Sequence, residues 1–392
     1  MTRLRVAFDV LPLAGELTGV GRFCAGLAAA LVRLEGLELR GYAVARRAGT
    51  DTAAPAGVLG LDVRTWPAPA RLANAVWGRA ELPPIEWLVG SVEVVHGTNY
   101  VVPPARHAGR VVSVHDLTAL RYPELCVPAS LAYPRLVGRA ARHGAFVHVP
   151  SSFVRDEVVD LLGVDAARVR VVPYGVDGPG QIAPARPPAP AGRPAPAGSP
   201  RSLERPSPSA PYLLALGAVE PRKDLPTLVR AFAELAPSHE DLELVVAGPD
   251  GWGAPAFTAA VAASGVARRV VRLGYLGEDE RRSLLSGAVA LAYPSLYEGF
   301  GFPPLEAMAS GVPVVATTAG SLPEVLGDAA ELVPPGDAGA LAGALARVIK
   351  DSGLRSRLIE AGRLRAASFT WASAAASMMD LYKLAALDRQ AR

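Results

Sequence analysis

The sequence predicts an α/β protein with two doubly wound domains. Short apolar runs, typical of buried parallel strands, alternate with helical segments along most of the chain. In each half, a strand is followed by a loop rich in glycine or basic residues and then by a helix, as at the start of a doubly wound domain. The 392 residues are enough for two complete hydrophobic cores.

Composition and charge exclude several classes of protein. Half of the residues are apolar and 20% are charged, as in ordinary globular proteins. A net charge of +3, with no basic run interleaved with aromatic residues, gives no support for a nucleic-acid partner. Cys24 and Cys126 form neither a metal-spaced pair nor a disulfide framework, so a reducing compartment is expected.

The beginning of the chain and its hydropathy predict a cytoplasmic protein. Charged residues lie within the first short strand, which is unlike a signal peptide. The sequence has no uncharged apolar stretch of about 18 residues or more, the length that a membrane span needs. Peripheral contact with a membrane stays open.

The first domain is predicted to comprise residues 1–177. Its strands are expected at residues 5–10, 37–45, 92–96, 110–114, 145–150 and 169–173. Gly15, Gly19 and Gly21 are predicted to form a loop before a helix at 23–34, and Ser151 or Ser152 is a suitable N-cap for a helix at 153–162. Residues 46–92, with three tryptophans and several prolines, predict irregular packing around short helices.

A proline-rich segment at residues 178–211 separates the two halves. Eleven of its 34 residues are proline, and its large aliphatic residues are Ile182 and Leu203. Such a segment buries too little surface to offset the entropy of ordering, so we expect an extended, mobile linker. We assign it no function.

The second domain is predicted to comprise residues 212–370, followed by a C-terminal helix within 371–392. Its strands are expected at residues 212–217, 242–247, 270–273, 288–293 and 312–316. Its helices are expected at residues 225–236, 255–264, 279–286 and 338–350, and Asp337 is a suitable cap for the last of these. The C-terminal helix itself is expected at 372–384.

The stretch from Tyr293 to Glu306 carries the strongest functional signal. It lies between a predicted strand and a helix whose first turn holds Pro303 and Pro304, where open α/β sheets bind ligands. Its glycines allow a close approach of the backbone, and the helix N-terminus favours an anion. Glu298 and Glu306, eight residues apart, can accept hydrogen bonds from sugar hydroxyls.

Phosphate and hydroxyl recognition together fit a nucleotide-sugar. The alternative is an ordinary glutamate near a helix N-terminus and a solvated loop glutamate.

A second anion site is predicted where the second domain begins. Arg222 and Lys223 lie between a strand that ends at Gly217 and the N-terminus of a helix. The alternative is a pair of solvated loop charges.

These motifs resemble the signature of the retaining glycosyltransferases of the GT-B fold, in the large family 4 group. Matching features extend from about residue 5 to about residue 384, except in the proline-rich segment. The resemblance implies two Rossmann-like domains with a cleft between them and a last helix that packs back on the first domain. The arginine that often follows the family's glycine is replaced by Ala218, and Arg222 is expected to substitute for it.

The resemblance also implies roles for particular residues. His115 and Glu298 are expected in catalysis, and Gly19 and Gly21 in a glycine loop that faces the cleft. The residues expected to bind the donor are Arg222, Lys223, Gly299, Phe300, Gly301, Leu305 and Glu306.

Weaker acceptor contacts are expected from three residues at strand ends, His96, Asn99 and Asp116. His96 can equally be a structural hydrogen-bonding residue, and His115 and Asp116 can instead cap their loop.

The expected reaction is the transfer of a hexose from a nucleotide-sugar to a hydroxyl acceptor with retention of configuration. No Asp-x-Asp motif stands near a predicted strand end, so neither a metal nor another cofactor is expected. The Arg-Lys pattern favours GDP-mannose slightly over UDP-sugars, and the acceptor can be a glycan, a lipid-linked glycan or a small molecule. Alternatives are a nucleotide-sugar epimerase, a phosphorylase or a non-catalytic binding protein on a similar scaffold.

Overall fold

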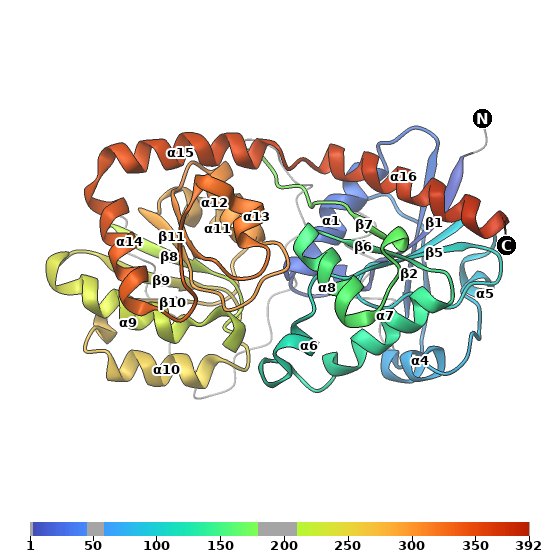
Figure 1. Ribbon diagram of the computed structural model, residues 1–392, viewed down its shortest axis with the longest axis horizontal. Helices are drawn as coiled ribbons and strands as arrows, with labels where there is room; N and C mark the ends of the chain where they lie inside the picture. Colours follow the sequence, from blue (N-terminus) through green and yellow to red (C-terminus); the bar gives the residue numbers. More distant parts are fainter. Residues whose placement is uncertain (1–2, 45–58, 179–209, 392) are drawn as a thin grey trace. The chain divides into compact units, whose positions relative to one another are not determined.

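The computed structural model describes residues 3–44, 59–178 and 210–391 (Figure 1). The chain divides into two compact units. The first holds the residues up to Gly175 and again those from Phe369 onward, and the second holds most of the chain between them. Most of the proline-rich segment, residues 179–209, and Ala45 lie outside the described residues.

The first unit is built on a parallel sheet in the order β3-β2-β1-β4-β5-β6-β7. Its strands are β1 Leu4–Asp9, β2 Leu37–Val44, β3 Val63–Trp66, β4 Val94–Gly97, β5 Gly109–Ser113, β6 Phe146–Val149 and β7 Val169–Val171. The strand order reverses between β1 and β4, where Phe8 pairs with His96. Such a reversal places the loops after these two strands on opposite sides of a crevice at the carboxyl edge of the sheet.

Helices cover both faces of this sheet (Figure 1). They are α1 Gly19–Leu31, α4 Ala70–Trp77, α5 Glu86–Val89, α6 Thr118–Arg121, α7 Tyr133–Arg142, α8 Ser152–Leu162 and α16 Trp371–Gln390. Short 3-10 turns are η1 Leu11–Leu13, η2 Pro123–Leu125, η3 Ser130–Ala132 and η4 Ala166–Arg168. The Ser151 hydroxyl accepts from the backbone N–H of Val154 and caps α8, as predicted.

Helix α16 returns to the first unit and packs beside α1, β4 and β5. Glycines allow this close approach. A Cβ atom at Gly109 would lie 2.2 Å from the carbonyl oxygen of Ala385, and one at Gly26 would lie 2.1 Å from the Trp371 ring. At Gly109 the backbone of α16 thus lies directly against the backbone of β5, and at Gly26 the Trp371 ring lies against the backbone of α1.

A buried hydrogen-bond chain joins α16 to three strands. The Tyr382 hydroxyl lies 2.7 Å from His96 Nδ1, and His96 Nε2 lies 2.7 Å from Ser113 Oγ. Ser113 Oγ lies 2.7 Å from His148 Nδ1, and His148 Nε2 lies 3.0 Å from the carbonyl oxygen of Val172. Because the Val172 carbonyl can only accept, one assignment of protons satisfies every group. Tyr382 donates to His96, His96 donates to Ser113, Ser113 donates to His148, and His148 donates to the Val172 carbonyl.

The second unit contains a parallel sheet in the order β10-β9-β8-β11-β12-β13. Its strands are β8 Tyr212–Leu216, β9 Glu243–Ala247, β10 Val270–Leu273, β11 Ala290–Tyr293, β12 Val314–Thr317 and β13 Glu331–Val333. The order reverses between β8 and β11, so the loops after these strands lie at the switch point.

Three of the helices of the second unit are capped by aspartates. The helices of this unit are α9 Leu225–Leu235, α10 Ala254–Ala263, α11 Glu278–Ser286, α12 Phe302–Ala309, α13 Leu322–Leu326, α14 Ala338–Lys350 and α15 Ser352–Ala367. The 3-10 turns are η5 Pro221–Lys223, η6 Ala236–Ser238, η7 Ala267–Arg269 and η8 Gly327–Ala329. Carboxylates of Asp224, Asp337 and Asp351 accept from backbone N–H groups in the first turns of α9, α14 and α15.

The predicted fold class is confirmed, since each unit is a doubly wound parallel sheet flanked by helices. Several local predictions are corrected. Gly19 and Gly21 lie in the first turn of α1 and not in a loop, because the extended Thr18 precedes a helix that starts earlier than residue 23. The region 46–92 contains a strand, β3, which ends at Trp66. Helix α15 was not predicted, and α16 is longer than expected.

We expect Gly109→Ala to destabilise the protein by about 3 kcal/mol, because the new Cβ would collide with the backbone of α16. Urea unfolding measures the change. Gly19→Ala is the control, since nothing lies within 4 Å of the Cβ position there and its effect should stay within about 0.5 kcal/mol. Equal stability of the two variants would contradict the proposed packing.

Stability should fall as the pH drops below about 6.5. Burial lowers the pKa of His115 to about 4 and of His148 to about 3, and lowers that of His96 well below 6.5. At a pH between these folded-state pKa values and 6.5, the unfolded chain binds more protons than the folded chain. The contribution of the histidines to the free energy of unfolding is therefore fully present above about pH 6.5 and is lost as the pH falls below it. The urea midpoint should therefore decrease from pH 7 to pH 5.

Two aspartates act in the opposite direction. Burial raises the pKa of Asp9 to about 7 from 3.8 and also raises that of Asp224, so these carboxyls favour the folded state more at low pH. The three histidines outweigh the two aspartates, and a constant midpoint between pH 7 and pH 5 would contradict the expectation.

Candidate functional site

Arg222 and Lys223 are fixed in the short turn η5, between β8 and α9. Asp224 follows them with a φ of 43°, a left-handed conformation that is uncommon for a residue with a side chain. Its carboxylate accepts from the backbone N–H of Thr227 and caps α9. The two cations therefore lie directly before the N-terminus of a helix, as predicted.

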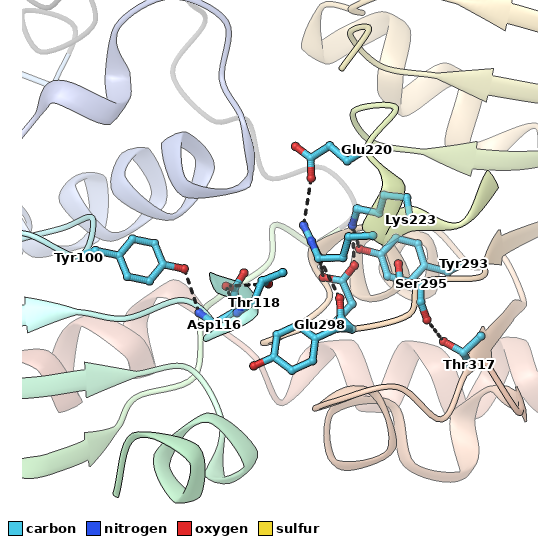
Figure 2. A network of polar contacts seen from close by, with 11 residues as sticks. Tyr100, Asp116, Thr118, Glu220, Lys223, Tyr293, Ser295, Glu298 and Thr317 are labelled. Carbon is cyan, nitrogen blue, oxygen red and sulfur yellow. Dashed lines mark hydrogen bonds and ion pairs between the residues drawn. The ribbon is translucent and has the colours of Figure 1, made fainter. Parts of the chain in front are cut away.

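Glu298 binds both cations (Figure 2). Its Oε2 lies 2.8 Å from Arg222 Nη1 and its Oε1 lies 2.6 Å from Lys223 Nζ. Lys223 also donates to the Tyr293 hydroxyl, and Arg222 donates to the carbonyl of Tyr297 at 3.0 Å. The loop after β8 and the loop after β11 are thus joined by one carboxylate.

This cluster is buried and ionised. The exposed fractions of the side chains are 17% for Arg222, 13% for Lys223 and 8% for Glu298. Burial by itself would raise the pKa of Glu298, but the charges of Arg222 and Lys223 outweigh it and bring that pKa to about 2. Burial lowers the pKa of Lys223, and Glu298 opposes that effect. Glu220 Oε2 also lies 3.4 Å from Arg222 Nη2, so two carboxylates face the two cations beside the helix N-terminus (Figure 2).

The backbone around Glu298 is held by the loop after β12. The N–H of Ser321 donates to the carbonyl of Glu298 at 2.9 Å, and the hydroxyl of Thr317 donates to the carbonyl of Ser295 at 2.5 Å (Figure 2). A Cβ atom at Gly320 would lie 2.2 Å from the Glu298 carbonyl oxygen, so glycine is needed there. A small pocket next to this cluster is lined in part by Gly217, Lys223, Tyr293 and Ser295.

The other predicted donor-binding residues surround the start of α12. Gly301, with a φ of 105°, is its N-cap. The side chains of Phe300 and Leu305 are buried in the protein, at 4% and 0% exposure, so a ligand would meet backbone rather than side chain at these positions. Gly299 lies between Glu298 and this turn.

Glu306 is separate from the cluster and has its own partner. Glu306 was predicted to lie in the first turn of the helix. In the structure it lies in α12 just after the first turn. Both of its oxygens are bound by Arg281 of α11, with Nη1 2.9 Å from Oε1. Arg281 was not predicted from the sequence. The available signal was its place on the same helix face as the buried Leu284 and Leu285, because an arginine that is buried needs an acidic partner.

His115, in the first unit, has protein partners at both ring nitrogens. Nε2 donates to the carbonyl of Thr98 at 2.8 Å, so Nδ1 is the acceptor for the Tyr174 hydroxyl at 2.5 Å. The ring is buried, and burial lowers its pKa to about 4. His115 could donate to a sugar only if its hydrogen bond to the Thr98 carbonyl were broken. These contacts favour the alternative that His115 holds its own loop in place.

The remaining predicted residues of the first unit differ in their surroundings. His96 is fully buried with both nitrogens bound, which matches its structural alternative. Asp116 Oδ1 accepts from the N–H and the hydroxyl of Thr118 at the start of α6, while the Asp116 N–H donates to the Tyr100 hydroxyl (Figure 2). Asn99 is partly exposed after β4. Gly21 lies against the carbonyl of Pro12, where a Cβ would come within 2.7 Å.

Comparison with known proteins identifies the family. The description "Glycosyltransferase Family 4" matches residues 17–178 and "Glycosyl transferases group 1" matches residues 203–365. A D-inositol 3-phosphate glycosyltransferase of Actinosynnema mirum is 32% identical over 312 residues, which cover 76% of this chain and 70% of that protein. The chain belongs to the family 4, group 1 glycosyltransferases. It is therefore an enzyme of the glycosyltransferase class.

Further relatives and one solved structure are similar to this chain. The O-antigen chain mannosyltransferase B of Escherichia coli is 27% identical over 74% of both chains. Five further proteins named D-inositol 3-phosphate glycosyltransferase are matched over only 50–56% of their own length. The Anabaena protein HepE, solved with UDP-glucose, matches with a TM-score of 0.69 at 16% identity, over 97% of this chain and 99% of HepE, which shows the shared fold.

None of the helices in the described ranges has both the length and the hydropathy to cross a membrane. Among the same residues, no three His, Cys, Asp or Glu side chains are grouped so that they could hold a metal ion.

We expect Glu298→Gln to cost about 3–5 kcal/mol, because it removes the close counterion of the buried Lys223 and leaves Arg222 with the longer ion pair to Glu220, at 3.4 Å. A second change, Lys223→Met, should restore part of this loss in the double variant. Asp62→Asn is the control, since Asp62 pairs with Arg64 on the surface, where both side chains are at least 60% exposed. Additive effects of the two buried changes, measured by urea unfolding, would contradict the coupling.

Proposed function

We propose that this enzyme transfers a hexose from a nucleotide-sugar to a hydroxyl acceptor, with retention of configuration and without a metal ion. The observation that carries the proposal is the buried cluster of Arg222, Lys223 and Glu298 at the switch point of the second sheet. It places an arginine and a lysine beside the N-terminus of α9, which suits a diphosphate. Membership of the glycosyltransferase family supports the same reading.

The cluster of Arg222, Lys223 and Glu298 is arranged to stabilise the negative charge that develops on the leaving diphosphate. Glu298 holds both cations in place before any ligand binds, so little reorganisation is required when the diphosphate departs. The backbone N–H groups of residues 299–301 add donors next to α12. The carboxylate oxygens of Glu298 and Glu306 suit sugar and ribose hydroxyls, and Arg281 fixes the orientation of Glu306.

In the reaction, the acceptor oxygen forms a bond to the anomeric carbon on the face from which the phosphate leaves. The bond between that carbon and the phosphate oxygen breaks, and its electron pair goes to the nucleoside diphosphate. The proton of the acceptor hydroxyl passes to the leaving phosphate oxygen. No side chain has to act as a strong base, which agrees with the neutral, fully bonded state of His115. His115 then serves to position the residues of its loop.

We favour GDP-mannose as the donor. Two relatives are named mannosyltransferases, the E. coli protein and a Mycolicibacterium hassiacum protein that is 44% identical over 114 residues, 28% of each chain. The Anabaena structure contains UDP-glucose, so UDP-sugars belong in the same test.

Calorimetric titration with GDP and UDP tests the donor site. We expect Lys223→Ala to weaken binding of the preferred nucleotide roughly tenfold to hundredfold, since a charge-assisted contact is lost. Lys350→Ala is the control, because Lys350 is an exposed lysine in the same unit and should leave binding unchanged. Unchanged affinity in Lys223→Ala would refute the assignment.

Retention and metal independence have their own measurement. The wild-type enzyme, supplied with a panel of nucleotide-sugars and treated with EDTA, should give a product whose anomeric configuration, determined by NMR, matches that of the donor. An inverted product, or activity abolished by EDTA and restored by Mg²⁺, would overturn this part of the proposal.

A further inference from the structure

Tyr293 is the last residue of β11, and its side chain contacts the ammonium group of Lys223 (Figure 2). Strand β11 lies inside the second sheet, paired with β8 on one side and with β12 on the other. The Tyr293 side chain is 2% exposed, and both Tyr293 and Lys223 line the small pocket beside the cluster. The sheet therefore fixes this tyrosine at the carboxyl end of a strand that borders the switch point.

The ammonium group of Lys223 has three N–H donors, and the protein uses two of them. One donates to Glu298 Oε1 at 2.6 Å, and one donates to the Tyr293 hydroxyl. Among the residues that the structure describes, the third N–H has no hydrogen-bond partner. Because the side chain is only 13% exposed, this third donor is poorly hydrated and is available to a ligand in the pocket.

Two contacts are needed to fix the direction of the third N–H. Lysine is a flexible four-carbon chain that ends in a compact charge, so a single ion pair with Glu298 would leave the ammonium group free to turn about that contact. The Tyr293 hydroxyl supplies the second contact. The centroid of the Tyr293 ring also lies 4.4 Å from Lys223 Nζ, within the range of a cation–π interaction. Tyr293 therefore restricts where Lys223 can point.

The two residues that hold Lys223 differ in charge. Glu298 is ionised, so it cancels part of the positive charge that would attract a phosphate. Burial raises the pKa of Tyr293 well above 10, so the tyrosine is neutral and holds the ammonium group without cancelling its charge. A second carboxylate at this position would hold Lys223 as well, but it would repel an anionic ligand.

We propose that Tyr293 is a positioning residue, which holds Lys223 so that its third N–H donates to the diphosphate of the donor. Tyr293 acts through Lys223 and needs no contact of its own with the substrate. This inference rests on the proposed function, because it takes the diphosphate as the ligand of Lys223. It goes further in assigning part of the affinity for that diphosphate to a neutral side chain of β11.

Calorimetric titration of the full-length protein with GDP and UDP measures the contribution of Tyr293. We expect Tyr293→Phe to weaken binding of the preferred nucleotide roughly fivefold to tenfold, because one hydrogen bond to a charged group is lost while the buried ring remains. Urea unfolding checks that the variant is folded.

Tyr212→Phe is the matched control. Tyr212 is also buried in the second unit, but it is the first residue of β8, at the amino edge of the sheet. Its hydroxyl donates to the carbonyl of Leu284 at 2.7 Å, so the control loses a hydroxyl hydrogen bond of similar length far along the neighbouring strand. Tyr212→Phe should lower the urea midpoint and leave nucleotide affinity unchanged.

A double-mutant cycle separates positioning from a structural role. In the Lys223→Ala background, Tyr293→Phe should change nucleotide affinity by about twofold at most, because the side chain through which the tyrosine acts is absent. A tyrosine that only supported the fold would weaken binding by the same factor with and without Lys223.

Two results would overturn the inference: equal nucleotide affinity in the wild type and Tyr293→Phe, or the same loss from Tyr293→Phe in the presence and in the absence of Lys223. Failure of the proposed function gives a different pattern, in which the wild type binds neither GDP nor UDP, or Lys223→Ala leaves the affinity for both unchanged.

Discussion

The ion pairs of Glu298 with Arg222 and Lys223 are the interaction on which the second unit depends. One carboxylate joins the loops that follow β8 and β11, and these are the two loops at the switch point of the sheet. Isolated cations of this kind would repel each other and would attract water into the edge of the sheet. The carboxylate keeps the pair buried and close together. In the function proposed here, the same contact holds both cations where a diphosphate would bind.

In the core of the first unit, four buried polar side chains are paired by neutral hydrogen bonds instead of ion pairs. Its core contains His96, Ser113, His148 and Tyr382, which are neutral and satisfy each other in one direction along a hydrogen-bond chain. A fully satisfied neutral chain costs little to bury and fixes the neighbouring elements in register.

The sequence was sufficient for the fold class and for most strands, because buried parallel strands are short apolar runs with clear ends. It also located Arg222, Lys223 and Glu298, but as separate parts of a ligand site; that the carboxylate binds both cations depends on two loops 75 residues apart. Arg281 was missed because its partner lies in another helix. The start of α1 was placed too late because Gly19 and Gly21 are poor helix formers. The tautomer of His115 depends on the Thr98 carbonyl, which no local pattern indicates.

The return of α16 to the first unit also has a consequence for the order in which the protein can mature. During synthesis, the strands of the first unit leave the ribosome long before Trp371 and Tyr382 are made. Until then Gly26 and Gly109 face an empty groove, and His96 Nδ1 lacks its partner. The nascent first unit must wait for the entire second unit to be translated before its core is closed. A chain cut short before Trp371 would thus damage the half of the molecule that was made first.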